Sequence, residues 1–180
     1  MKIKVSIILV FFSVVTMIAQ EKYITKSGQL SFEASVPSFE EVKADNSNVS
    51  AILKDNGDFA SLTLMKGFRF KVALMEEHFN ENYVESSEFP KTTFRGKIKD
   101  FDMAALGDQE KNYVIEGVIN MHGTDKAVEV PVTMKKTDEG IHLTTNFILK
   151  PGDFNIEIPS IVKSKIADEV NVSAKYLLKN

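Results

Sequence analysis

Apolar and polar side chains alternate through most of the chain, and this alternation limits the fold more than any other feature of the sequence. Leu30, Phe32 and Ala34, for example, are separated by Ser31 and Glu33. Alternation with a period of two places the apolar side chains on one face of a β-strand. Further apolar segments that read as strands lie at residues 49–53, 59–65, 68–72, 92–101, 114–121, 128–134, 141–149, 154–158 and 170–178.

Turn-forming residues separate these segments, so neighbouring strands are expected to pair antiparallel. Asn56-Gly57 between two of them predicts a β-hairpin, because glycine adopts a positive φ at little cost. Helical spacing of apolar residues predicts a short helix at 74–79, and a second is expected over 160–168. Pro131 has no amide hydrogen, so a bulge or an unpaired neighbour is expected beside it. About eight or nine strands with one apolar face each pack as a sandwich or as a closed barrel.

The first 20 residues have the layout of a secretory signal peptide. Two lysines precede an uncharged apolar run over residues 5–18, and small or polar residues follow. The run is short for a membrane span, although an uncleaved N-terminal anchor is the alternative. We therefore predict a signal peptide over residues 1–20 and one domain over residues 21–180, periplasmic or secreted, without membrane insertion once the peptide is removed.

Composition argues against several classes of function. Removing Lys2 and Lys4 leaves 20 basic and 25 acidic residues, a formal charge of −5, which argues against a nucleic-acid-binding surface. The same charge weakens the case for docking on anionic lipid headgroups. The chain has no cysteine, which removes disulfides, thiol catalysis and thiolate metal sites. The sequence has no motif for a serine nucleophile, a phosphate-binding loop or a helical zinc site, so we expect no catalytic residue, no cofactor and no metal.

Several ordered stretches carry a resemblance to a known family. Residues 74–79, with the sequence LMEEHF, resemble its histidine-containing turn, and residues 89–94 resemble its Phe-Pro loop and the strand that follows. Residues 114–132 resemble its glycine-containing hairpin, and residues 153–156 and 166–170 resemble its closing stretch. The family is that of the YceI-like proteins. The motifs that carry the resemblance begin at Leu74, and the match covers most of the mature chain.

The resemblance implies an extended, antiparallel, lipocalin-like β-barrel of about eight strands with one or two short helices. It also implies a long-chain isoprenoid or a related lipid as the partner, held in an apolar tunnel without catalysis; a homodimer is compatible with it. Two other functions stay open. One is an enzyme that acts on small amphiphiles, with His78 and Glu76 or Glu81 as acid–base groups. The other is a structural or stress-related envelope protein whose barrel has a solid core.

The tunnel wall is expected to consist of apolar side chains from the strand faces and the helical segment, namely Phe32, Phe68, Phe70, Met75, Phe79, Phe94, Ile98, Ile115, Ile119, Val128, Val130, Phe147 and Ile156. His78 falls where the family keeps a histidine. It could contact a ligand headgroup at the tunnel mouth, but a bond to a backbone carbonyl or to Glu81 is favoured. His122 is expected in a hairpin turn and His142 on a solvated strand face, which gives no metal-ligand spacing.

Overall fold

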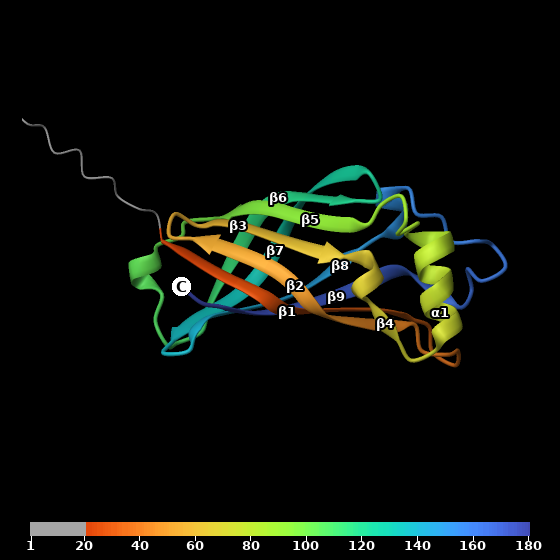
Figure 1. Cartoon of the computed structure of the whole chain (residues 1–180), viewed down its shortest axis with the longest axis horizontal. Coiled ribbons are helices and arrows are strands. Elements are labelled where there is room, and N and C mark those ends of the chain that lie inside the picture. The colour runs from red at the N-terminus through yellow and green to blue at the C-terminus, as the bar shows by residue number, and fades with distance from the viewer. Residues whose placement is uncertain (1–20) are drawn as a thin grey trace, which may run out of the picture.

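In the computed structural model, which describes residues 21–180, antiparallel β-strands form a closed barrel (Figure 1). The predicted signal peptide over residues 1–20 lies outside the described residues. The long strands of the described part are β1 (Lys22–Ser35), β2 (Lys43–Lys54), β3 (Asp58–Leu64), β5 (Lys91–Ile98), β6 (Lys111–Met121), β7 (Thr124–Thr137), β8 (Gly140–Leu149) and β9 (Ile166–Leu178). A further strand, β4 (Arg69–Phe70), pairs with the start of β2 alone.

The barrel closes because β1 pairs on both of its edges. On one edge Leu30 lies opposite Ala174 of β9, and on the other Tyr23 lies opposite Leu53 of β2. From β9 the order continues through β8, β7, β6, β5 and β3 to β2, with each pair antiparallel. The predicted antiparallel barrel is therefore confirmed, and the sandwich that alternation alone left open is excluded.

Short helical segments lie between the strands. Helix α1 (Ala73–His78) continues into the π-helical turn η2 (Phe79–Tyr83), which confirms the helix predicted at 74–79. Single turns of 3₁₀-helix are η1 (Met65–Gly67), η3 (Met103–Ala105) and η4 (Pro151–Phe154). The predicted hairpin is also confirmed, because β2 and β3 pair up to the turn and Gly57 has a φ of +86°. Within residues 21–180, no helix has the length and apolar character that a bilayer crossing requires.

Three local predictions are wrong. Residues 160–165 form turns instead of a helix, because β9 begins at Ile166 and pairs with both β1 and β8, whereas a short helix has little stability of its own. Residues 154–158 form no strand, because the chain turns through η4 and Asn155 takes a left-handed φ of +57°. The strand expected over 68–72 is only the two residues of β4, because α1 begins directly after it.

Pro131 marks the point where β7 separates from β8. The β7–β8 ladder runs only from Val132 to Thr137, and the Thr145 hydroxyl donates to the Pro131 carbonyl oxygen at 2.6 Å. On its other edge β7 stays in register with β6 past Pro131, without a bulge. The unpaired neighbour expected beside this proline is therefore confirmed.

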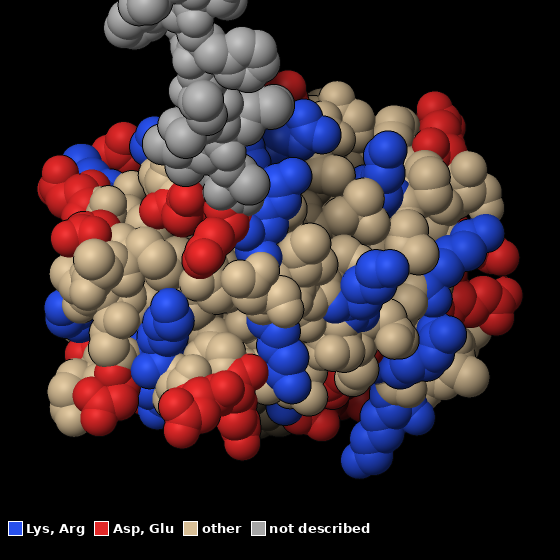
Figure 2. All heavy atoms as spheres, turned by 60° about the vertical axis from the view of Figure 1, so that its left-hand side comes forward, with Lys and Arg blue, Asp and Glu red and all other residues tan. Residues whose placement is uncertain are grey.

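The two ends of the barrel are built differently. At the end where β1 begins and β9 ends, five buried side chains that are at most 1% exposed pack into the lumen: Leu53, Ile98, Met134, Ile141 and Leu178. We call this the filled end. The C-terminus lies there, and the face that includes this end carries acidic and basic side chains interspersed (Figures 1 and 2). Helix α1 and the loops of residues 36–42 and 155–165 lie at the opposite end (Figure 1).

Candidate functional site: an apolar cavity in the barrel

A cavity of about 500 Å³ extends through the lumen from the packed side chains of the filled end to the end that carries α1. Small-molecule sites commonly have volumes of roughly 300–1,000 Å³. The wall is formed by inward-facing side chains of β1, β3 and β5 to β9, with contributions from α1, η2 and the two loops. Exposed residues Phe39, Glu40 and Lys165 belong to the wall, so the cavity reaches solvent at this end, which we call the mouth.

Most of the residues predicted from the sequence lie together on this wall. They are Phe32, Phe68, Phe70, Met75, Phe79, Phe94, Ile115, Ile119, Val130, Phe147 and Ile156. Ile98 is not on the wall, because it belongs to the packed side chains of the filled end. Val128 is not on the wall either; it is half-buried and packs against the cluster that contains Phe154, in the part of β7 that has separated from β8.

Four phenylalanine rings form a cluster beside the mouth. The ring centroid of Phe32 lies 5.1 Å from that of Phe68, 5.7 Å from Phe70 and 5.3 Å from Phe79. The Phe79 centroid is also 5.6 Å from Phe68 and 5.2 Å from Phe70. Aromatic pairs at these spacings attract one another beyond simple area burial. The cluster therefore holds η2, which carries Phe79, against the end of the barrel.

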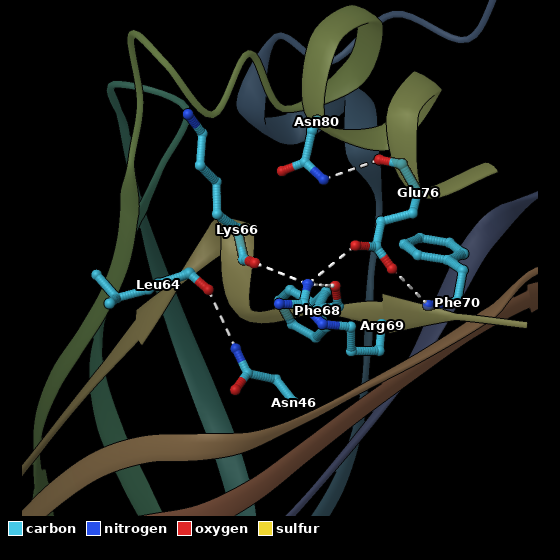
Figure 3. A network of polar contacts seen from close by, with 8 residues as sticks. All are labelled: Asn46, Leu64, Lys66, Phe68, Arg69, Phe70, Glu76 and Asn80. Carbon is cyan, nitrogen blue, oxygen red and sulfur yellow. Dashed lines mark hydrogen bonds and ion pairs between the residues drawn. The ribbon is translucent and has the colours of Figure 1, made fainter. Parts of the chain in front are cut away.

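Glu76 fastens α1 to β4 (Figure 3). Its carboxylate accepts a hydrogen bond from Arg69 Nη1 at 2.9 Å and another from the Phe70 backbone amide at 3.1 Å, while its carbonyl accepts from the Asn80 side-chain amide at 2.8 Å. Because the ion pair is partly exposed, it adds little stability by itself. Its effect is positional, since it fixes the helix relative to the phenylalanine cluster.

His78 lies on the cavity wall and its side chain is exposed. We expected a hydrogen bond from this histidine to fix the helical turn. Glu76 and Asn80 make the bonds that do so instead. A contact between His78 and a ligand headgroup stays a prediction.

His122 is the histidine that holds separate loops together. In its expected hairpin turn, its Nδ1 lies 3.1 Å from the carbonyl oxygen of Phe154 and its Nε2 lies 2.7 Å from a carboxylate oxygen of Glu85. Its ring centroid is 4.3 Å from that of Phe89, and its side chain is only 11% exposed. Because each nitrogen faces an acceptor, both bonds form together only when both nitrogens carry hydrogen. The β6–β7 turn, the loop after η2 and η4 are joined at this ring.

Replacing His122 with Ala is expected to lower the free energy of unfolding by about 2 kcal/mol, because the carbonyl of the fully buried Phe154 loses its donor. Urea denaturation followed by circular dichroism measures the change. His78→Ala is the matched control, since an exposed side chain usually contributes within about 0.5 kcal/mol. Equal stabilities of the two variants would contradict the role assigned to His122.

Two tyrosines provide hydrogen-bonding groups in the wall. Burial raises the pKa of the Tyr176 phenol, although a hydrogen bond with Ser61 opposes the shift, and burial also raises the pKa of Tyr83. Both phenols therefore stay neutral near pH 7. Among the described residues no three His, Asp or Glu side chains converge in a way that could hold a metal ion. The wall can bury an apolar molecule and offer it a few neutral hydrogen bonds.

Sequence reasoning missed the part of the wall that the loops provide. Val42 and Val162 line the cavity, but they lie in segments without periodicity. Ile158 also lines it, and its alternation with Phe154 and Ile156 was visible in the sequence. Ala174 and Tyr176 of β9 also line it. Their alternation was visible in the sequence and could have placed them there.

The fold and the cavity define a class of protein, an antiparallel barrel with an apolar cavity that opens at one end. A sequence model of the YceI-like domain matches residues 12–177, and the chain belongs to the YceI-like family. No curated protein matches the sequence significantly.

Solved structures share the fold at low sequence identity. A polyisoprenoid-binding domain from Saccharophagus degradans, implicated in plant cell wall breakdown, is 11% identical, with a TM-score of 0.78 over 89% of this chain and 99% of that one. BcnA of Burkholderia cenocepacia is 18% identical, with a TM-score of 0.70 over 85% of this chain and 96% of that one. The YceI protein of Campylobacter jejuni is 13% identical, with a TM-score of 0.52 over 100% and 94%.

Proposed function

We propose that this protein binds or carries a long apolar lipid of the polyisoprenoid type inside its barrel, without catalysing a reaction. The observation that carries the proposal is the apolar cavity of about 500 Å³. Each CH₂ group of a ligand that leaves water contributes roughly 0.8 kcal/mol, so a hydrocarbon chain needs few polar contacts to bind. The Saccharophagus degradans domain is a polyisoprenoid-binding domain, which supports the same class of ligand here.

The proposed contacts are the eleven predicted side chains on the cavity wall, with His78 at the mouth as the group nearest a ligand headgroup. The signal-peptide pattern of residues 1–20 supports export to the periplasm or the cell exterior. In this role the protein takes its ligand from one membrane or partner and holds it away from water.

The two alternatives fit the molecule less well. A protein with a solid core would have no cavity of this size in its barrel. An enzyme that uses His78 with Glu76 would need a free carboxylate, but both oxygens of Glu76 accept hydrogen bonds that hold α1 in place. Glu81 is exposed and does not belong to the cavity wall.

Extraction of the protein purified from its native host tests the proposal. Organic solvent should release a long-chain isoprenoid or a related lipid in a stoichiometric amount, identified by mass spectrometry. The same procedure on a host strain without the gene provides the blank. The proposal fails if no lipid is recovered and the refolded, empty barrel also takes up no fluorescent isoprenoid alcohol.

A further inference from the structure

Three segments around the mouth each expose one large apolar side chain. Phe39 on the loop of residues 36–42 is 48% exposed, Leu74 on α1 is 56% exposed and Ile161 on the loop of residues 155–165 is 83% exposed. The other large apolar side chains that are exposed within residues 21–180 all lie on strands. Single exposed apolar residues are common on protein surfaces. Three of them on separate segments around a single opening form a set, which we call the mouth rim.

The mouth rim continues the cavity wall outward. Phe39 is part of the wall itself, and Ile161 and Leu74 are followed in sequence by Val162 and Met75, which are part of it. The apolar surface therefore extends from the interior of the barrel to its exposed edge. The charged residues of the wall at this edge are Glu40 and Lys165.

Two lysines accompany the most exposed residue of the rim. Lys163 and Lys165 follow Ile161 and are exposed, and residues 158–166 contain no acidic residue. Glu40 and Glu41 on the adjacent loop, Glu157, and Glu76 and Glu77 on α1 make the three segments negative as a whole, so the positive charge is confined to the tip that carries Ile161. The loop that carries Ile161 is thus positively charged, although the chain has a negative net charge. Apolar tips next to lysines are the combination that holds protein segments at the interface of a bilayer with anionic headgroups.

We propose that the mouth rim docks on the surface of a phospholipid bilayer. Ile161 and Phe39 enter the boundary between headgroups and acyl chains, while Lys163 and Lys165 face anionic headgroups. The proposal rests on the function proposed above, because a lipid is transferred most directly through an opening held against its source. The filled end then points away from the membrane (Figure 1).

Cosedimentation of the folded domain, residues 21–180, with vesicles of phosphatidylethanolamine and phosphatidylglycerol tests the docking. The wild-type domain should sediment with the vesicles, and Ile161→Asp should weaken its partitioning by about tenfold or more. Replacing both Lys163 and Lys165 with Ala should weaken binding to these vesicles. The wild-type domain should bind pure phosphatidylcholine vesicles more weakly, and the double substitution should not change that binding. Ile24→Asp is the matched control, because Ile24 is a 46% exposed isoleucine at the filled end and should not matter.

Three results would overturn the docking. The wild-type domain could stay in the supernatant with every vesicle, or Ile24→Asp could weaken binding as much as Ile161→Asp. The third result is that Ile161→Asp changes the sedimentation coefficient of the domain in the absence of vesicles. The mouth rim would then be a contact between copies of the chain. Lipid extraction from the same preparation separates the two proposals, since recovered lipid without vesicle binding refutes only the docking.

Discussion

Replacing Ala174 with Trp is expected to weaken the binding of an isoprenoid lipid by about a hundredfold while the barrel stays folded. Ala174 is 3% exposed and lies on the cavity wall. An indole there would enter the empty cavity, so the usual cost of overpacking a core should not arise. Displacing about four CH₂ groups of the ligand, at roughly 0.8 kcal/mol each, accounts for the expected loss. Titration of the empty domain with a fluorescent isoprenoid alcohol measures it.

Ala127→Trp is the control for this experiment. Ala127 lies on β7 with its side chain exposed and is not part of the cavity wall, so its replacement should leave lipid binding unchanged. Urea denaturation of both variants checks that each is folded. Wild-type affinity in the Ala174→Trp variant would mean that the lipid binds outside the cavity.

The second large effect concerns the backbone of the barrel. Gly117→Val is expected to lower the free energy of unfolding by about 3 kcal/mol, because the site has no room for a side chain. Gly117 and Gly96 lie opposite each other on β6 and β5. A Cβ atom on Gly117 would lie 2.8 Å from the Cα atom of Gly96 and would collide with the carbonyl oxygen of Arg95. These are backbone atoms of a paired strand and cannot rotate away.

Gly107→Val provides the matched comparison. A Cβ atom on Gly107 would meet no other atom within 4 Å, so this variant should stay within about 0.5 kcal/mol of the wild type. Thermal denaturation of both variants gives the two values. Similar melting temperatures for the two variants would show that β5 and β6 can move apart to accept a side chain.

The strands could be predicted because each one carries its own alternation. The closure of the barrel could not, because it depends on the pairing of Leu30 with Ala174, two residues from opposite ends of the domain. The alternation within a strand contains no information about which distant strand it pairs with. The prediction of a closed barrel therefore came from the resemblance to a family. The helix expected over residues 160–168 failed for the same reason, since pairing of β9 with its neighbours decides the conformation from Ile166 onward.

The candidate site was predictable only in part. Alternation shows which face of a strand points inward but not how deep a residue lies along the barrel. Ile98 and Ile115 are cross-strand partners and both point inward, yet Ile98 packs in the filled end while Ile115 also borders the cavity. The role of His122 depends on Glu85 and Phe154, which only the fold brings to its ring.

The position of the C-terminus at the filled end has a practical consequence for handling the protein. Asn180 follows the last strand at the end of the barrel opposite α1 (Figure 1). An affinity tag or a surface linker fused there would leave the molecule on the side away from the mouth. Barrels immobilised through such a linker would face the bulk solution with their openings free, an orientation suited to measuring lipid exchange on a sensor chip.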